Sequence, residues 1–243
     1  MSIYASSHNG ATEKAIETVR PAQERLETAQ RSYPSLRAPR PLPPAATSLP
    51  IGAFATTLTT LSLSLMEWRG VTTTNVYIAN FFFLAAFGLF VSAQWELTGG
   101  NGFGYSVFSA FGLFYAGYGA ILTPSFGVAA AYGDDTTQLN NALVWSVFVL
   151  AYLVASLPTN VVYILIFVFV ELAFVTVAAS YFAAADGHPT ASVALKKSGG
   201  AFAFLAGLVG WYLTFHLLLK DSIVELPLGD TSKYFPKTRK KVD

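Results

Sequence analysis

The sequence predicts an all-α membrane protein with six transmembrane helices and both termini in the cytoplasm. Two observations carry the helical membrane prediction. Only 12% of the 243 residues are charged and 53% are hydrophobic, whereas a soluble domain carries roughly 25% charged residues. The hydrophobic residues also gather into six stretches of about 20 residues, the length that a helix needs to cross a bilayer. This composition argues against a soluble enzyme.

Short segments rich in turn-forming residues separate the six stretches. Pro158 marks a sharp return between the fourth and fifth, because proline cannot continue a helix and restrains the residue before it. The other breaks fall at 70–75, 99–104, 132–140 and 183–198. We expect the spans at residues 50–67, 77–96, 106–125, 141–157, 161–182 and 199–219.

Polar tails flank the membrane domain of residues 49–219. Residues 1–48 are expected to be a solvated, largely disordered tail, with an amphipathic or regulatory role as the alternative. Within it, residues 11–32 favour a helix that Pro21 breaks or kinks, and six prolines predict an extended linker over 34–50. Residues 220–243 form a basic tail.

The distribution of basic residues predicts the orientation. Six Lys/Arg precede the first span and six lie from Lys220 onward, whereas the loops hold only Arg69, Lys196 and Lys197. Lys and Arg concentrate on the cytoplasmic side of membrane proteins. With an even number of spans, both termini are therefore expected in the cytoplasm.

The sequence lacks the residues that several kinds of catalysis and binding require. The chain has no cysteine and a net charge of +1, which removes thiol chemistry and gives no basic excess for nucleic acid. It shows no nucleotide-binding glycine loop, no metal-ligand spacing and no hydrolase triad. Transport or channel function is favoured by elimination, and we expect neither enzymatic activity nor a cofactor.

One carboxyl group interrupts the apolar stretches. Glu171 lies in the middle of the fifth span, where an ionised carboxylate facing lipid would be costly. It is either a proton-coupling group or a neutral acid that hydrogen-bonds a neighbouring helix. His216, near the end of the sixth span, is expected to be structural. Small residues at helical spacing, such as Ala203 and Gly207, are expected to pack helices closely.

Two adjacent motifs resemble a known family. Residues 95–104 read Trp-Glu-Leu-Thr-Gly-Gly-Asn-Gly-Phe-Gly, and residues 108–114 read Phe-Ser-Ala-Phe-Gly-Leu-Phe. They resemble the acetate uptake transporter family, the acetate/succinate–proton symporters of bacteria and fungi. Further similar stretches lie at 124–127, 199–212 and 224–229. The long polar N-terminal extension resembles fungal members.

The resemblance implies positions for functional residues. The matching family-motif residues are Pro50, Gly52, Glu96, Asn101, Phe103 and Gly104. Of the family's first-span signature, matched at 47–53, only Pro50 and Gly52 are unchanged. The positions that correspond to the family's pore constriction and substrate choice are Thr56, Phe111, Val170 and Gly210.

These residues predict a membrane transporter for small monocarboxylates, acetate first. The resemblance implies proton coupling, with Glu171 as the candidate group, a homohexamer with one conduit per subunit, and a plasma-membrane location. Two alternatives stay open: a passive channel for small anions or neutral acids, and a non-transporting membrane sensor or scaffold that acts through its tails.

Overall fold

The computed structural model describes residues 19–25, 27–28, 44–128, 131, 140–220 and 222–235. The chain divides into two compact units, residues 1–40 and 41–243. In the first unit, residues 19–25 and 27–28 are helical, and the helix is not broken at Pro21. All other elements belong to the second unit.

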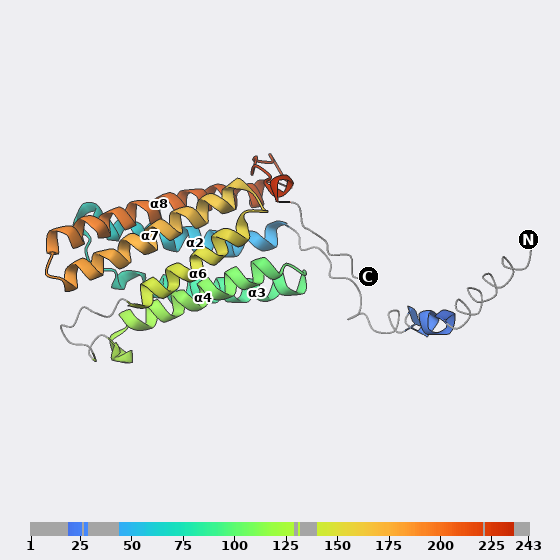
Figure 1. The fold of residues 1–243 in the computed structure, drawn as a ribbon, viewed down its shortest axis with the longest axis horizontal. Helices are drawn as coiled ribbons and strands as arrows, with labels where there is room; N and C mark the ends of the chain where they lie inside the picture. Colours follow the sequence, from blue (N-terminus) through green and yellow to red (C-terminus); the bar gives the residue numbers. More distant parts are fainter. Residues whose placement is uncertain are drawn as a thin grey trace, which may run out of the picture. The chain divides into compact units, whose positions relative to one another are not determined.

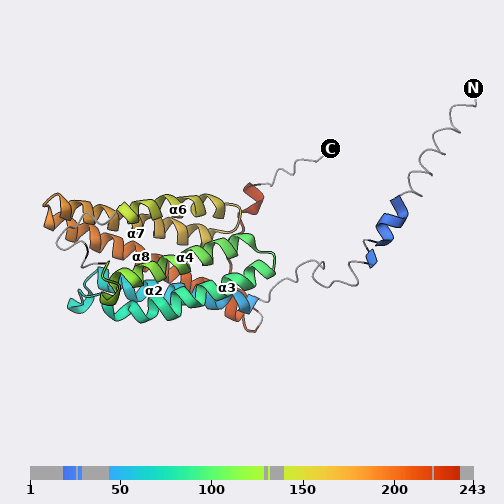
Figure 2. The ribbon, with the colours of Figure 1, turned by 90° about the horizontal axis from the view of Figure 1, so that it is seen from below.

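The second unit is a bundle of helices that run along a common direction (Figures 1 and 2). Helix α8 packs against both α7 and α2, α3 packs against α4, and α6 packs against α7. The principal helices are α2 (Pro44–Leu65), α3 (Phe87–Thr98), α4 (Gly102–Leu122), α6 (Asn140–Ser156), α7 (Val161–Ala185) and α8 (Pro189–Leu219). A π-helical segment, η4 (Asn80–Ala86), leads directly into α3. The short 3₁₀ segments are η2 (Trp68–Gly70), η3 (Asn75–Tyr77), η5 (Pro124–Phe126) and η6 (Ser232–Tyr234).

Length and hydropathy confirm the all-α membrane fold. Five helical segments of the described chain are long and apolar enough to cross a bilayer: Thr47–Leu65, Asn80–Thr98, Gly102–Leu122, Val161–Ala185 and Pro189–Leu219. The fourth predicted span corresponds to α6, in which Ser146–Ser156 is a shorter apolar helix. Six spans and the cytoplasmic position of both termini therefore remain predictions. The predicted break at 132–140 lies largely outside the described residues.

Two predicted irregular segments are wrong. The extended linker over 34–50 is helical from Pro44 onward, and Pro50 is buried inside α2. Proline leaves a single carbonyl without its helical donor, a loss that neighbouring helices can compensate in a membrane protein. The break at 183–198 ends at His188, because α8 begins with Pro189 at its first turn. Hydropathy marks where the apolar stretch begins, whereas the helix itself extends further into polar sequence.

Glycine allows α2 and α8 to approach closely. A Cβ added at Gly207 would lie 2.5 Å from Thr59 Oγ1, and one at Gly200 would lie 2.9 Å from Leu65 Cβ. The expected close packing by small residues is therefore found on α8. Beyond the end of α2, an ion pair of 2.7 Å between Lys197 and Glu67 connects the following turn to α8.

Candidate functional site

A small apolar cavity lies between α2, α3, α4 and α7. Its volume is about 30 Å³, which is room for about two water molecules. Its lining surface is apolar throughout. The residues that line it are Ile51, Phe54, Leu89, Val107, Phe108, Phe111, Tyr163, Ile166, Phe167 and Val170. Helices far apart in the sequence thus converge on one narrow space inside the bundle.

Aromatic rings narrow the cavity. The rings of Phe54 and Phe111 meet edge to face, with their centroids 6.2 Å apart. Phe111 also lies 6.4 Å from Phe167. Aromatic pairs favour such edge-on and tilted arrangements at these separations. These pairs connect α2, α4 and α7. The space left in the cavity therefore depends on the positions of the three rings.

The structure brings together two of the predicted constriction residues. Phe111 and Val170 line the cavity and are 5% and 2% exposed. Thr56 is not part of the lining, and its hydroxyl donates to the carbonyl of Gly52 in its own helix, at 2.7 Å. Phe54, two residues earlier, supplies the aromatic ring on α2 instead.

Gly210 acts on the cavity through Phe54. A Cβ added at Gly210 would lie 3.4 Å from the Phe54 ring and 3.2 Å from Ala55 Cβ. Gly210 on α8 therefore lies directly behind the Phe54 ring, without lining the cavity itself. Sequence reasoning missed Phe54, although it is the one phenylalanine between Thr47 and Thr56.

The motif residues build a polar cluster at the end of the bundle where α3 turns into α4. Glu96 is 3% exposed. Thr47 donates to its Oε1 at 2.8 Å, and Asn101 Nδ2 donates to its Oε2 at 2.7 Å. Asn101 Oδ1 accepts the backbone N–H of Gly104 at 3.0 Å and so caps α4. A buried carboxylate needs such donors, and these donors fix the starts of α2 and α4 relative to α3.

The remaining motif residues connect this cluster to the cavity. A Cβ at Gly104 would lie 2.6 Å from Asn101 Nδ2 and 3.0 Å from Glu96 Oε2, so only glycine fits beside the cluster. Phe103 meets Phe167 of the cavity wall edge to face at 6.2 Å. On α2, a Cβ at Gly52 would lie 3.4 Å from Thr214. The motif thus positions the helices around the cavity.

Glu171 follows Val170 on α7 but is not part of the cavity lining. Its side chain is partly buried. Its Oε2 is buried and has no hydrogen-bond partner among the described residues. The structure therefore leaves the two roles expected for this carboxyl group untested. Within the described chain, no group of three or more His, Cys, Asp or Glu side chains is arranged to hold a metal ion.

Membrane-length helices packed around an internal cavity define a multi-pass α-helical membrane protein. Residues 31–230 match the model of the GPR1/FUN34/yaaH family, and the chain belongs to this family. This confirms the resemblance found in the motifs, because relatives named for acetate transport are among its matches.

Curated relatives and a solved structure resemble the chain. The acetate transporter protein patA of Aspergillus clavatus is 50% identical over 200 residues, which cover 80% of this chain and 81% of the relative. Acetate permease A of Emericella nidulans is 32% identical over 174 residues, covering 68% of this chain and 58% of the relative. The structure described as the bacterial acetate channel SatP superposes with a TM-score of 0.65 at 21% identity, covering 76% of this chain and 98% of that one. At that identity the likeness shows the fold.

Proposed function

We propose that this protein conducts small monocarboxylates, acetate first, across a membrane. The observation that carries the proposal is the narrow apolar cavity between four helices, with Phe54, Phe111 and Val170 in its wall. The relatives named as acetate transporters support the substrate. Acetic acid has only four non-hydrogen atoms, so it requires less widening of this cavity than a longer acid would.

The lining explains why a proton should accompany the substrate. A carboxylate that enters an apolar space loses its hydration, which is costly when no charged partner replaces the water. Protonation removes that charge. The acid then passes the Phe54–Phe111 pair as a neutral molecule and releases the proton on the far side. Coupling through Glu171, next to Val170 on α7, is our proposal for how a proton is supplied.

The proposal includes the number of spans, the orientation, the oligomeric state and the membrane in which the protein lies. Six spans correspond to α2, η4 with α3, α4, α6, α7 and α8, and the excess of Lys and Arg in the tails favours cytoplasmic termini. The family resemblance favours a homohexamer in the plasma membrane. We infer no enzymatic activity.

A passive channel is the second candidate, and the cavity itself favours it. The lining contains no carboxylate, and Glu171 lies outside it. A neutral acid needs no coupling group to cross such a space. This reading predicts the same flux with and without the Glu171 carboxyl group, because no side chain has to exchange a proton. A membrane sensor or scaffold that acts through its tails is the remaining alternative, and deletion of residues 1–45 distinguishes it, because a transporter should keep its flux.

Reconstitution into proteoliposomes tests the proposal. Radiolabelled acetate should enter protein-containing vesicles faster than empty ones. An imposed pH gradient, acidic outside, should drive accumulation above equilibration with the outside, and a protonophore should abolish it. To separate coupling from simple diffusion of acetic acid, empty vesicles receive the same gradient. Protein-dependent acceleration that is unchanged in Glu171→Gln would support the passive channel, and no acceleration would refute transport of acetate.

A further inference from the structure

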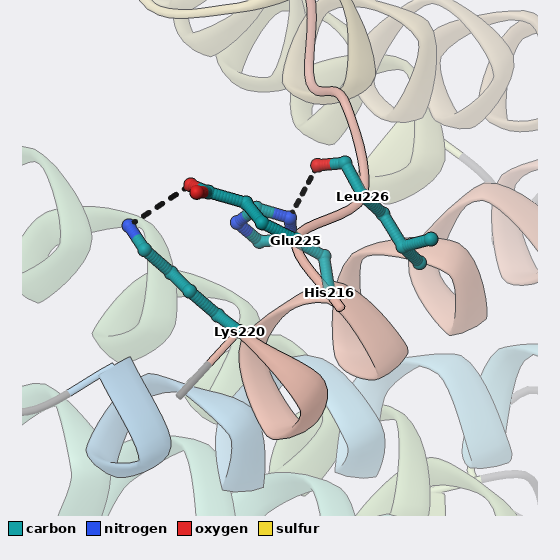
Figure 3. Close-up of polar contacts among 4 residues, drawn as sticks. All are labelled: His216, Lys220, Glu225 and Leu226. Atoms are coloured by element: carbon teal, nitrogen blue, oxygen red, sulfur yellow. Dashed lines mark hydrogen bonds and ion pairs between the residues drawn. The ribbon is translucent and has the colours of Figure 1, made fainter. Parts of the chain in front are cut away.

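The segment after α8 folds back along the end of the bundle. We call residues 222–235 the C-terminal strap. Nδ1 of His216 donates to the carbonyl of Leu226 at 2.6 Å, because a carbonyl oxygen can only accept (Figure 3). One turn further along α8, Lys220 pairs with Glu225 at 3.5 Å. Tyr212 donates its hydroxyl to the carbonyl of Pro227 at 2.7 Å.

The other side of the strap is bound to the turn between α6 and α7. The backbone N–H of Val161 donates to the carbonyl of Gly229 at 2.9 Å, and the N–H of Thr231 donates to the carbonyl of Thr159 at 3.3 Å. The hydroxyl of Thr231 donates to the carbonyl of Leu157 at 2.7 Å. The strap therefore connects the last turns of α8 to the first turn of α7. In the sequence, the whole length of α7 and α8 lies between these two points.

The strap lies at the end of the bundle where α7 begins, close to the cavity-lining part of that helix. Val161 is two residues before Tyr163, which lines the cavity. A Cβ added at Gly229 would lie only 3.2 Å from Val161 Cβ, so the strap is in close contact with α7 there. Leu228 packs against the hydrophobic core. In both overall views the strap lies at the same end as the start of α2 and the turn between α3 and α4 (Figures 1 and 2).

The contacts of the strap are of a kind that opens more readily than the bundle. Apart from the packing of Leu228 and Gly229, they consist of single hydrogen bonds and an ion pair whose side chains are 40% and 64% exposed. Ile223 is 81% exposed and Tyr234 is 69% exposed. Segments with few buried apolar contacts and exposed hydrogen bonds open locally at a lower free energy than a packed core.

We infer that the C-terminal strap is a lid, which closes the conduit at this end of the bundle and lifts for a substrate to pass. Leu228 is the side chain that seals the core, and His216 is the buried anchor on α8. The inference rests on the proposed transport of a small acid. It assigns to residues 222–235 a gating role.

Cross-linking can lock the lid. Asn160 and Asp230 are directly opposite each other in an antiparallel bridge, and the bonds on either side make them a non-hydrogen-bonded pair. Such pairs have Cα atoms about 4.5 Å apart, which suits a disulfide. The chain contains no cysteine, so Asn160→Cys with Asp230→Cys introduces the only thiols. Oxidation of the double variant should lower protein-dependent acetate uptake at least tenfold, and reduction should restore it.

The single variants Asn160→Cys and Asp230→Cys, treated with the same oxidant, are the controls and should keep their uptake. Full uptake by a completely cross-linked protein would overturn the lid. Failure of the pair to cross-link would contradict the docked position of the strap. If the unmodified protein transports no acetate, the proposed function fails, and the lid is then judged by an assay that needs no transport.

That assay measures thiol labelling of Leu228→Cys by a water-soluble maleimide. Thr231→Val deletes the hydroxyl bond to Leu157 and should speed labelling about threefold or more, because the strap opens more often. Thr176→Val is the matched control, because the Thr176 hydroxyl bonds only to carbonyls of its own helix, Leu172 and Ala173. Equal labelling rates in the two variants would overturn the lid.

Discussion

The ring of Phe54 on α2 meets the ring of Phe111 on α4 edge to face, with centroids 6.2 Å apart, inside the cavity wall. Gly210 on α8 lies behind Phe54, where an added Cβ would be 3.4 Å from the ring. Residues of three helices thus meet at this aromatic pair. The side chains involved come from the first, third and sixth predicted spans.

Removing the Phe54 ring should widen the conduit. In Phe54→Ala we expect butyrate uptake to rise at least threefold relative to acetate uptake, because the longer chain no longer meets the ring. Loss of a buried phenylalanine also costs about 3–5 kcal/mol of stability, so the folded fraction must be measured in the same preparation. Phe83→Ala is the matched control, because Phe83 is 78% exposed. An unchanged ratio of butyrate to acetate would contradict a constriction at Phe54.

The same substitution at two glycines should have opposite effects on stability. Gly207→Ala places a Cβ 2.5 Å from Thr59 Oγ1 and should destabilise the protein by about 1–3 kcal/mol through overpacking. Gly117→Ala finds nothing within 4 Å and should stabilise α4 by about 0.5–1 kcal/mol. The midpoint of thermal unfolding in detergent should fall for the first variant and rise for the second. A rise in both would show that α2 and α8 are not in close contact at Thr59.

Replacing the carboxyl group of Glu96 with an amide should destabilise the protein. Both carboxylate oxygens accept hydrogen bonds, from Thr47 and Asn101, so the NH₂ of Glu96→Gln must face a donor. We expect a loss of about 1–3 kcal/mol, measured as a lower midpoint of thermal unfolding. Glu67→Gln removes a half-exposed ion pair on the surface and should cost less than about 1 kcal/mol. Equal midpoints for the two variants would argue against Glu96 as the buried acceptor.

Glu171→Gln tests the proposed proton coupling. At acidic pH, accumulation of radiolabelled acetate should collapse, whereas equilibrative entry should persist, because the amide cannot exchange a proton. Glu67→Gln, outside the apolar spans, serves as the control and should accumulate acetate normally. Unchanged accumulation in Glu171→Gln would refute a coupling role and leave this carboxyl group as a packing residue.

Much of the membrane architecture could be read from the chain, because hydropathy over about 20 residues is a local property that a bilayer selects for. The predicted spans at 106–125 and 161–182 agree with α4 and α7 within a few residues. The motif residues Glu96, Asn101 and Gly104 were found by resemblance, and their mutual contacts follow from their closeness along one turn. Phe111 and Val170, which the same resemblance pointed to, line the cavity, and their role in a substrate constriction stays a prediction.

The sequence by itself determined the helical membrane class, the family and the position of the motifs. The tertiary structure decided that Phe54 rather than Thr56 faces the cavity, that Gly210 acts from behind it, and that residues 222–235 lie across α7 and α8. The physical reason is that hydropathy and spacing describe one helix at a time. Which face of α2 turns inward depends instead on its packing against α8, where Gly200 and Gly207 allow close approach. The docking of the strap depends on the carbonyls of Leu157 and Thr159, which lie in the turn at Pro158.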